Sequence, residues 1–453
     1  MDLTGKKVLV FGTGISGIGA AKCLEEMQAF PVLYDGNEKL DCDEIRQKGQ
    51  FKETTQIFTG TFPEEQKEQI ELFVISPGIS FEHPFACEFK QRGIPVWSEV
   101  ELAYQLDQGD LIAITGTNGK TTTTTLTGEI LSAYNKQTIV VGNIGKSYTR
   151  EVRNTVKGSV TVAEISSFQL ETIQDFHPKI SAILNITPDH LDRHHTYENY
   201  IKEKEKIALN QTKDDSIILN YEDEETRKFG ELTKAQPVYF SSAHVLKDGI
   251  YLKDDVIYKA VNGTSERLLS IYETKLLGIH SYENIMAAIA IADAYGVGMD
   301  LILSVVKEFR AVEHRIEFVA TKNGVDYYND SKGTNVDAAI KGIQAMVKPT
   351  YLIGGGYNKK ASYEDWILSF DGKVKELILM GQTKEAIAEC ARSHHFDAIY
   401  FAESMEDAVK HCADEAVDGD AVLLSPACAS WGMFKNYEER GRIFKDLVNK
   451  LGE

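Results

Sequence analysis

The glycine turn at residues 115–122, Thr-Gly-Thr-Asn-Gly-Lys-Thr-Thr, constrains the fold of this chain more than any other feature. The apolar run Leu111–Thr115 predicts a buried strand before it, and a threonine-rich segment after it predicts a helix. A strand that turns through glycines into a helix indicates an α/β fold with parallel strands. Backbone N–H groups of such a turn can hold a phosphate, Lys120 can reach the β and γ phosphates of a nucleotide, and the Thr121 hydroxyl can bind Mg²⁺.

This turn departs from the general P-loop pattern, because Ile114 stands where the first glycine of that pattern would fall. The alternative interpretation is the start of a threonine-rich helix with a solvated lysine. Gly-Lys-Thr at a strand-to-helix turn favours the phosphate-binding interpretation.

Strand and helix signals alternate along all 453 residues, and we predict three α/β domains. Residues 1–97 are expected to be Rossmann-like, residues 98–312 a P-loop ATPase-type domain with a mostly parallel sheet, and residues 313–453 Rossmann-like again. The predicted strands are Lys7–Phe11, Pro31–Tyr34, Leu72–Ile75, Leu111–Thr115, Thr138–Val141, Val160–Ile165, Ile180–Leu184, Thr350–Ile353, Glu376–Met380, Ala398–Phe401 and Ala421–Leu424.

Composition excludes several classes of function. The chain has 49 basic and 68 acidic residues, a net charge of −19, which disfavours nucleic acid and anionic membrane surfaces as partners. Its 6 cysteines have no CxxC spacing, which is typical of a reducing compartment and of neither a disulfide framework nor a zinc site. No apolar stretch approaches the length of about 20 residues that a membrane span needs. We therefore expect a cytoplasmic protein without membrane insertion.

A second glycine turn, Gly12-Thr13-Gly14-Ile15-Ser16-Gly17, follows the first predicted strand, and Asp35 ends the next one. This is formally a dinucleotide fingerprint, and an NAD-dependent oxidoreductase is the alternative function that it suggests. The turn itself does not specify NAD, because glycines at a helix N-terminus can bind any diphosphate. A tight turn without a ligand also remains open.

Polar residues follow two further strands of the second domain. Glu164 ends one apolar strand, and His190 lies in a loop after another, where side chains of parallel sheets face the ligand crevice. Both are candidate metal ligands, whereas His194 and His195 are expected at the surface. Lys204 shares a helical face with Tyr200, so it either extends its ammonium group to water or has a function; the residues alone favour the first.

Three polar clusters follow strands of the third domain: residues 329–335, 354–359 and 425–437. Each is compatible with ordinary turn chemistry, but together they place lysines and hydroxyls in one crevice that suits a small dicarboxylate. Cys428 has no evident base beside it and is expected to be a buried packing residue rather than a nucleophile.

These segments together resemble the Mur ligase family over the whole chain. The resemblance rests on TGTNGKTT, EISSFQLE, NITPDHLDRH, YIKEK, HSYEN, EHR, NDSKGTN and SPACASWGMFKNYEERG, and the last two are most similar to the D-glutamate-adding members. It implies an ATP-dependent ligase that adds D-glutamate to UDP-N-acetylmuramoyl-L-alanine through an acyl phosphate, in peptidoglycan precursor synthesis. Folylpolyglutamate synthase ranks lower, and a non-catalytic ATP-binding regulator is disfavoured by the joint presence of Lys120, Glu164, His190 and Lys204.

The resemblance also implies roles for single residues. The ATP-binding residues would be Gly116, Thr117, Asn118, Gly119, Lys120, Thr121, Thr122, Asn284, Arg315 and Asp330. The UDP-substrate would contact Gly14, Ile15, Ser16, Asp35, Ser76, Gly78, Asn143 and Ser166. D-glutamate would contact Lys332, Thr334, Lys359, Ser430, Trp431 and Tyr437. One of two Mg²⁺ ions would be held by Thr121 and Glu164, and the other by His190 and a carbamate formed from Lys204 and CO₂. The implied enzyme acts as a monomer, and its catalytic residues would be Lys120, Glu164, His190, Lys204 and Arg315.

Some positions depart from the pattern of the family. Gly36-Asn37 differs from the Thr-Arg of some members, Ser281 stands where Asn often follows the histidine, and Trp431 replaces a more common Leu. Lys360 follows Lys359, so either could be the glutamate-binding lysine.

Overall fold

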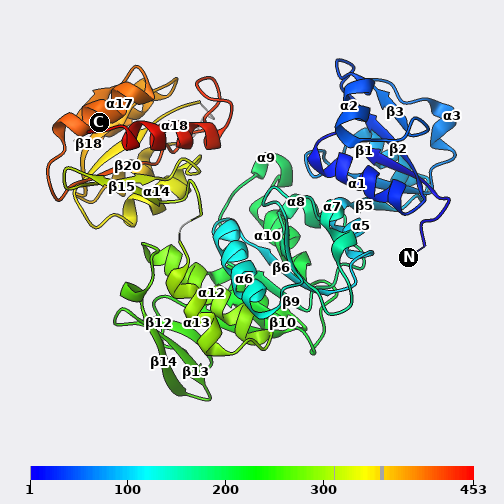
Figure 1. Ribbon diagram of the computed structural model, residues 1–453, viewed down its shortest axis with the longest axis horizontal. Helices are drawn as coiled ribbons and strands as arrows, with labels where there is room; N and C mark the ends of the chain where they lie inside the picture. The colour runs from blue at the N-terminus through cyan, green and yellow to red at the C-terminus, as the bar shows by residue number, and fades with distance from the viewer. Residues whose placement is uncertain (1, 311, 358–361, 453) are drawn as a thin grey trace. The chain divides into compact units, whose positions relative to one another are not determined.

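The computed structural model describes residues 2–310, 312–357 and 362–452 (Figure 1). The chain divides into two compact units. Met1–Ile271 and Glu283–Lys307 form the first unit, and Tyr272–Tyr282 and Glu308–Glu453 form the second.

The first unit begins with a parallel sheet in which the described strands have the order β3-β2-β1-β4-β5. The strands are β1 (Lys7–Phe11), β2 (Phe30–Asp35), β3 (Gln56–Thr59), β4 (Leu72–Ile75) and β5 (Val96–Ser98). The helices are α1 (Ile15–Glu26), α2 (Cys42–Gly49), α3 (Glu64–Lys67), α4 (Pro84–Gln91) and α5 (Glu99–Tyr104). One face of the sheet is packed by aromatic rings, with Phe11 stacked on both Tyr34 and Phe73.

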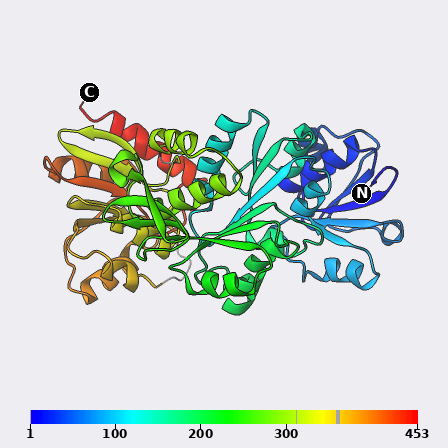
Figure 2. The same ribbon diagram turned by 90° about the horizontal axis from the view of Figure 1, so that it is seen from below.

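The second sheet of this unit has the described strand order β14-β13-β12-β11-β10-β9-β6-β8-β7, with helices on both of its faces (Figure 2). Its strands are β6 (Asp110–Thr115), β7 (Thr138–Gly142), β8 (Val160–Glu164), β9 (Ile180–Ile183), β10 (Ser216–Asn220), β11 (Gln236–Ser241), β12 (Gly249–Lys253), β13 (Val256–Val261) and β14 (Thr264–Ser270). Its helices are α6 (Lys120–Tyr134), α7 (Tyr148–Glu151), α8 (Ser167–Leu170), α9 (Leu191–His194), α10 (Tyr197–Glu205), α11 (Glu224–Leu232), α12 (Ile279–Ala294) and α13 (Met299–Glu308). Because β6 lies between β8 and β9, the loops after these three parallel strands meet at one edge.

The second unit contains a sheet with the described order β15-β16-β20-β17-β18-β19. Its strands are β15 (Glu317–Lys322), β16 (Val325–Asn329), β17 (Thr350–Gly354), β18 (Val374–Leu379), β19 (Ile399–Phe401) and β20 (Ala421–Leu424), and all but β15 are parallel. The helices are α14 (Val336–Gln344), α15 (Glu364–Leu368), α16 (Lys384–Ser393), α17 (Met405–Glu415) and α18 (Tyr437–Asn449).

The predicted α/β class is confirmed, and each predicted strand is present within one or two residues of its expected bounds. The antiparallel meander β12–β14 was not predicted, although its turns carry recognisable signals. Asp254-Asp255 and Asn262-Gly263 connect its strands, and all four residues have positive φ, as tight hairpin turns require.

No helix within the described ranges is long and apolar enough to cross a membrane.

Candidate functional site

The glycine turn after β6 is braced by the loop after β9. The Asn118 N–H donates to Oδ1 of Asn185 at 2.8 Å, and the Thr117 N–H donates to the Asn185 carbonyl at 2.9 Å. Gly116 and Gly119 have φ values of +151° and +85°, which only glycine adopts without strain. The turn is therefore fixed in shape, with its N–H groups at the start of α6.

Lys120 closes this turn with its own ammonium group. Its Nζ donates to the carbonyls of Gly116 and Thr117, both at 2.8 Å. Thr121 and Thr122 follow as buried residues of the first helical turn. The predicted ATP-binding residues of the turn thus form one local cradle with a positive charge inside it.

Asn284 completes the packing behind the cradle from α12. Its Oδ1 accepts a hydrogen bond from the Thr123 hydroxyl at 3.3 Å. A Cβ on Gly119 would lie 2.2 Å from the same oxygen, so no larger residue fits there without a shift. The predicted neighbourhood of Asn284 and the glycine turn is therefore present in the structure.

Glu164 is buried at the end of β8, with 1% of its surface exposed. Its Oε1 accepts a hydrogen bond from Asn143 Nδ2 at 2.9 Å, whereas its Oε2 has no hydrogen-bond partner among the described residues. A buried carboxylate oxygen without a partner is costly unless a ligand satisfies it. This oxygen fits a cation, and Glu164 is not an acid of the solvated surface.

Lys204 is also buried, with 1% of its surface exposed, so its side chain does not extend to water. Its Nζ donates to the Gly116 carbonyl at 2.8 Å and lies 4.7 Å from the centre of the Tyr200 ring. Burial, together with the nearby charge of Lys120, lowers the pKa of Lys204 well below its ordinary value. The structure therefore favours a neutral amine at this position.

His190 precedes α9 with a positive φ of 52°, and half of its side chain is exposed. Its ring contacts Phe168 edge-on, with centroids 4.9 Å apart. The His190 Nε2 lies 3.6 Å from Oδ2 of Asp189. An exposed imidazole beside a carboxylate can bind a metal ion.

The expectation that His194 lies at the surface is wrong, whereas His195 is exposed. His194 Nε2 lies 3.0 Å from the Ser167 hydroxyl, and its ring packs against Phe168 and Tyr200. Burial lowers the pKa of His194 to about 4, so the ring is neutral at pH 7. The pattern Asp-His-Leu-Asp-Arg-His-His is polar apart from Leu191 and gives no sign of this burial.

The N-terminal glycine turn precedes α1 as predicted. Gly14 is the N-cap residue of α1, without a side-chain cap, and Ile15 is 73% exposed. Asp35 accepts hydrogen bonds from the backbone and the hydroxyl of Thr13 at 3.1 and 2.8 Å. Ser16 lies in the first turn of α1.

The other predicted UDP-substrate residues lie in loops of the same unit. The buried Ser76 Oγ has no hydrogen-bond partner within the described ranges, and it lies against Gly12, where a Cβ would approach it to 2.7 Å. Gly78 is exposed, and Ser166 caps α8 in a capping box with Gln169. Ser166 therefore has a structural role that the sequence analysis did not assign to it.

The second unit brings together the polar clusters that follow β16, β17 and β20, because these strands are adjacent in the sheet. Arg440 of α18, with 1% of its surface exposed, connects two of them: its Nε donates to Ser331 Oγ at 2.9 Å and its Nη1 to the Cys428 carbonyl at 3.1 Å. Tyr357 connects the cluster after β17 to the cluster after β20, because its N–H donates a hydrogen bond to the Ala429 carbonyl at 2.9 Å.

The candidate glutamate-binding residues differ in exposure. Lys332 Nζ lies 5.5 Å from the centre of the Tyr437 ring, and the Thr334 N–H donates to the Lys332 carbonyl at 2.8 Å. Ser430 is buried, whereas Trp431 is 55% exposed and its ring lies 5.6 Å from that of Tyr357. Lys359 lies outside the described residues.

Arg315 and Asp330 belong to this second unit. Asp330 is buried and accepts a hydrogen bond from Ser425 Oγ at 2.7 Å. Burial raises its pKa to about 7, against the opposing effect of the Arg315 charge. Arg315 Nε is buried and has no hydrogen-bond partner in the part of the chain that the structure describes. Cys428 is buried as expected, with its Sγ 3.4 Å from the hydroxyls of Tyr363 and Thr383.

Comparison with known proteins gives a consistent result along the chain. Residues 6–98 match the Mur ligase MurD-like N-terminal domain, residues 114–292 the Mur ligase middle domain, and residues 314–428 the Mur ligase glutamate ligase domain. UDP-N-acetylmuramoylalanine--D-glutamate ligase of Lachnospira eligens is 57% identical over 453 residues, covering 100% of both chains.

The chain belongs to the Mur ligase family. A second relative, the same ligase of Lachnoclostridium phytofermentans, is 50% identical to this Mur ligase and covers 100% of its chain, with 99% of the relative matched. Among solved structures, UDP-N-acetylmuramate-alanine ligase MurC of Thermotoga maritima has a TM-score of 0.60 at 20% identity, covering 98% of this Mur ligase and 99% of that chain. A pseudomurein peptide ligase type C of Methanothermus fervidus has a TM-score of 0.59 at 16% identity, covering 98% and 100%. These two likenesses show the shared three-domain fold.

Three further residues of this Mur ligase support the site, and none of them was predicted to do so. The Tyr200 hydroxyl lies 3.1 Å from Thr117 Oγ1, and Arg193 donates to the Ile79 carbonyl at 3.0 Å and to Glu171 Oε1 at 2.9 Å. Arg440 is the third, and its spacing from Phe444 on the buried face of α18 was a usable signal.

Proposed function

We propose that this Mur ligase joins D-glutamate to UDP-N-acetylmuramoyl-L-alanine with conversion of ATP to ADP and phosphate, in peptidoglycan precursor synthesis. The full-length similarity to ligases of that name carries the choice of substrates. The geometry of the glycine turn, Glu164 and Lys204 supports the chemistry.

A carboxylate resists attack by an amine, because it is anionic and has no leaving group. Transfer of the γ-phosphoryl group of ATP to the alanyl carboxylate makes an acyl phosphate and ADP. The D-glutamate amine then attacks the acyl carbon, the C–N bond forms, and phosphate leaves with the electrons of the C–O bond. The first step brings an anion to a polyanion, so the site must supply positive charge.

The residues of the glycine turn supply part of that charge. Gly116, Thr117, Asn118 and Gly119 present N–H groups to the phosphates, and Lys120 exchanges its bonds to loop carbonyls for bonds to phosphate oxygens. Asn284 supports the turn from behind. In our proposal Arg315 and Asp330 of the second unit complete the site when the two units act together on ATP.

Mg²⁺ neutralises phosphate charge and orients the γ-phosphoryl group when it is bound. The partnerless Oε2 of Glu164 suits one ion, with Thr121 as its second protein ligand. His190 and a carbamate on Lys204 would hold a second ion. The carbamate forms when the neutral Lys204 amine adds to CO₂ and loses a proton, and the burial that depresses the pKa of this lysine keeps the amine neutral.

The remaining candidate residues bind the UDP-substrate and D-glutamate. The diphosphate of the UDP-substrate lies at Gly14, Ile15 and Ser16, with Asp35, Ser76, Gly78, Asn143 and Ser166 around it. D-glutamate lies at Lys332, Thr334, Ser430, Trp431 and Tyr437, with Lys359 as a further charge partner for its carboxylates. We place the domain boundaries at residues 98 and 313, and we propose a cytoplasmic monomer.

Phosphate release tests this function. The full chain is incubated with ATP, Mg²⁺ and UDP-N-acetylmuramoyl-L-alanine, and amino acids are supplied one at a time. We expect turnover with D-glutamate and little with L-glutamate, D-aspartate or D-alanine. Equal turnover with several amino acids would contradict the proposed specificity.

The variant Lys120→Ala tests whether the nucleotide and UDP sites are separate. We expect it to lose ligation while it keeps its affinity for the UDP-substrate, measured by calorimetry. A parallel loss of UDP-substrate affinity would show that Lys120 serves that substrate instead.

A further inference from the structure

The guanidinium of Arg193 connects the two sheets of the first unit. Arg193 lies in α9, which follows β9 of the second sheet. Its Nη1 donates to the Pro77 carbonyl at 3.2 Å, and its Nη2 donates to the Ile79 carbonyl at 3.0 Å. Both carbonyls belong to the loop after β4 of the first sheet, and the UDP-substrate candidates Ser76 and Gly78 lie in the same loop. One side chain therefore ties this substrate loop to the second sheet.

Glu171 holds the guanidinium in place from the end of α8. Arg193 Nε donates to Oε1 of Glu171 at 2.9 Å, and Nη2 donates to Oε2 of the same carboxylate. The side chains of Arg193 and Glu171 are only 13% and 5% exposed. Two parallel N–H bonds to one carboxylate fix the plane of a guanidinium as well as its position. The ring of Phe168 lies against this plane, with its centre 4.5 Å from Cζ of Arg193.

The short helix α8 also carries a UDP-substrate candidate. Ser166 is its N-cap residue and Glu171 its C-cap residue, so the candidate and the partner of Arg193 lie at the two ends of one helix. The capping box between Ser166 and Gln169 fixes the first of these ends. The pair of Arg193 and Glu171 thus sets the separation between Ser166 and the loop of residues 76–79. A ligand that contacts both depends on this separation.

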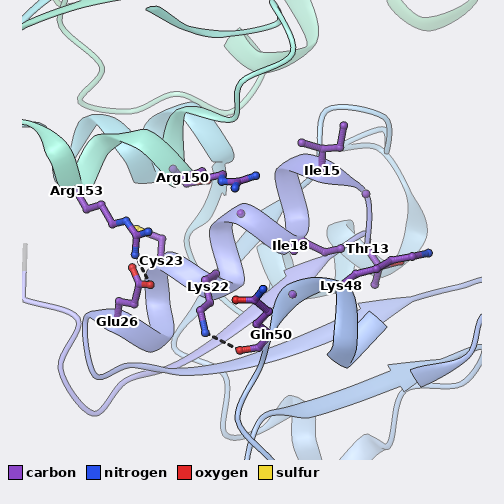
Figure 3. A pocket seen from close by; sticks show the side chains of 14 residues that line it. Thr13, Ile15, Ile18, Lys22, Cys23, Glu26, Lys48, Gln50, Arg150 and Arg153 are labelled. Carbon is purple, nitrogen blue, oxygen red and sulfur yellow. Dashed lines mark hydrogen bonds and ion pairs between the residues drawn. The ribbon is translucent and has the colours of Figure 1, made fainter. Parts of the chain in front are cut away.

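The glycine turn before α1 does not share this connection. Gly14 and Ile15 line a pocket of about 570 Å³ along α1 (Figure 3). The described residues that line this pocket do not include Arg193, Glu171 or the loop of residues 76–79. A ligand that is bound only at this turn should therefore have an affinity that is independent of Arg193.

We propose that Arg193 is a positioning residue for the UDP-substrate, an inference that rests on the proposed function. The pair of Arg193 and Glu171 holds the loop of residues 76–79 and the Ser166 end of α8 at the separation that bound UDP-N-acetylmuramoyl-L-alanine spans. Because this separation is fixed before the ligand binds, less conformational freedom is lost on binding. UDP alone occupies the glycine turn before α1 and gains nothing from the pair.

The double variant Arg193→Met/Glu171→Leu separates positioning from stability. It removes the hydrogen bonds to the carbonyls of residues 77 and 79 but leaves no unpaired buried charge, so we expect its melting temperature to stay close to that of wild type. The single variant Arg193→Met should melt at a lower temperature, because Glu171 then remains buried without its counter-charge.

Calorimetry compares two ligands, UDP and UDP-N-acetylmuramoyl-L-alanine. Both are titrated into the full chain without Mg²⁺, with ADP at saturation to occupy the glycine turn after β6. We expect the double variant to bind the UDP-substrate at least about tenfold more weakly than wild type, because its loop is no longer preorganised. UDP should bind within about twofold of wild type, which also reports that the first sheet is folded.

The control is Arg92→Met/Glu88→Leu, which removes another arginine–glutamate pair of the first unit. Arg92 Nη2 lies 2.6 Å from Oε1 of Glu88, and the two side chains are 34% and 32% exposed. We expect this variant to bind both ligands as wild type does, because a solvated ion pair contributes little to stability and these two side chains hold no substrate loop.

Equal losses of affinity for UDP and the UDP-substrate would indicate a general structural role and would overturn the positioning role. An unchanged affinity of the double variant for the UDP-substrate would also overturn it, while the proposed function would stand. A wild type that binds UDP but not the UDP-substrate would contradict the proposed function and the positioning role together.

Discussion

The surroundings of some polar side chains in this enzyme cannot be inferred from residue type, because these side chains are buried in the folded chain. Lys204 and His194 both lie in polar stretches of the sequence, yet both are buried beside Tyr200. The helical face of Lys204 was readable from its spacing to Tyr200, whereas nothing local distinguishes His194 from His195. The difference arises because His194 packs on Phe168 and Ser167 of α8, a contact between segments that only the folded chain brings together.

Lys204 provides a test of the proposed carbamate. Lys204→Ala is expected to lose ligase activity by more than about 100-fold, beyond what loss of an outer partner of a metal ligand costs. A small carboxylate such as formate should restore part of the activity, because it can take the place of the carbamate oxygens. Activity is measured as phosphate release with all three substrates.

Lys202→Ala is the control, because Lys202 is exposed on the same helix. We expect it to keep wild-type activity and to gain nothing from formate. A Lys204→Ala enzyme that stays fully active in CO₂-depleted buffer would exclude the carbamate.

His194 makes stability depend on pH. Its pKa in the folded chain is about 4, below the ordinary value of 6.5, so the unfolded chain binds more protons between these two values. The free energy of unfolding therefore rises with pH across this window by up to about 1.4 kcal/mol per pH unit, and this contribution is lost as pH falls from 6.5 toward 4. Denaturant unfolding without Mg²⁺, at pH 4.5 to 7, measures it.

In this experiment His194→Gln should flatten the pH dependence, while His195→Gln, at an exposed position, should leave it as in wild type. His280, whose pKa burial also lowers to about 4, accounts for part of the remaining slope. An unchanged slope in His194→Gln would mean that the His194 ring is protonated in the folded state.

At the scale of elements, short apolar runs predicted parallel strands such as β1, β4 and β20, whereas the parallel strands β10 and β16 and the antiparallel meander β12–β14 were not predicted. β1, β4 and β20 are short, continuous apolar runs with bounds that the sequence defines. The meander β12–β14 is polar on one side, and its strand Thr264–Ser270 is largely exposed over its first four residues. The apolar pattern of the meander is too weak to predict its strands, although Asn262-Gly263 is a strong hairpin signal.

The glycine turn between β6 and α6 can be tested as an element. Gly119→Ala places a methyl group 2.2 Å from Asn284 Oδ1, and it also forces alanine to a φ of +85°. We expect loss of ATP binding and a lower melting temperature. Gly158→Ala provides a matched control, because Gly158 has a φ of +92° and no atom within 4 Å of its added Cβ.

Both variants carry a backbone cost of about 1–3 kcal/mol, so the difference between them isolates the contact with Asn284. Gly158→Ala should keep its affinity for ATP analogues. If the two variants bind ATP equally well, the turn tolerates the added methyl group, and the contact with Asn284 does not restrict residue 119 to glycine.

At the scale of the whole molecule, the proposed chemistry is divided between two units. The first unit contains the glycine turn, Glu164 and Lys204. The second unit contains Arg315, Asp330 and the glutamate-binding candidates. The three domains were readable from the repeated change of strand and helix signals. The joint use of residues from both units has no local sequence signal, because these residues lie far apart in the sequence.

A reaction that needs residues from both units predicts closure around ligands. We expect the radius of gyration, measured by X-ray scattering, to decrease when a non-hydrolysable ATP analogue and the UDP-substrate are present together. Neither ligand alone should give the full decrease. A radius that does not change with both ligands would indicate that the units are already closed.

Trp431 gives the enzyme an internal optical reporter. The sequence contains 3 tryptophans, and Trp97 and Trp366 are buried at 3% and 0% exposure, whereas Trp431 is exposed. A water-soluble quencher such as iodide should therefore extinguish emission from Trp431 alone. Because Trp431 lies at the proposed amino-acid site, D-glutamate in the presence of the other substrates should shield it from iodide, and occupancy of that site becomes measurable without a label.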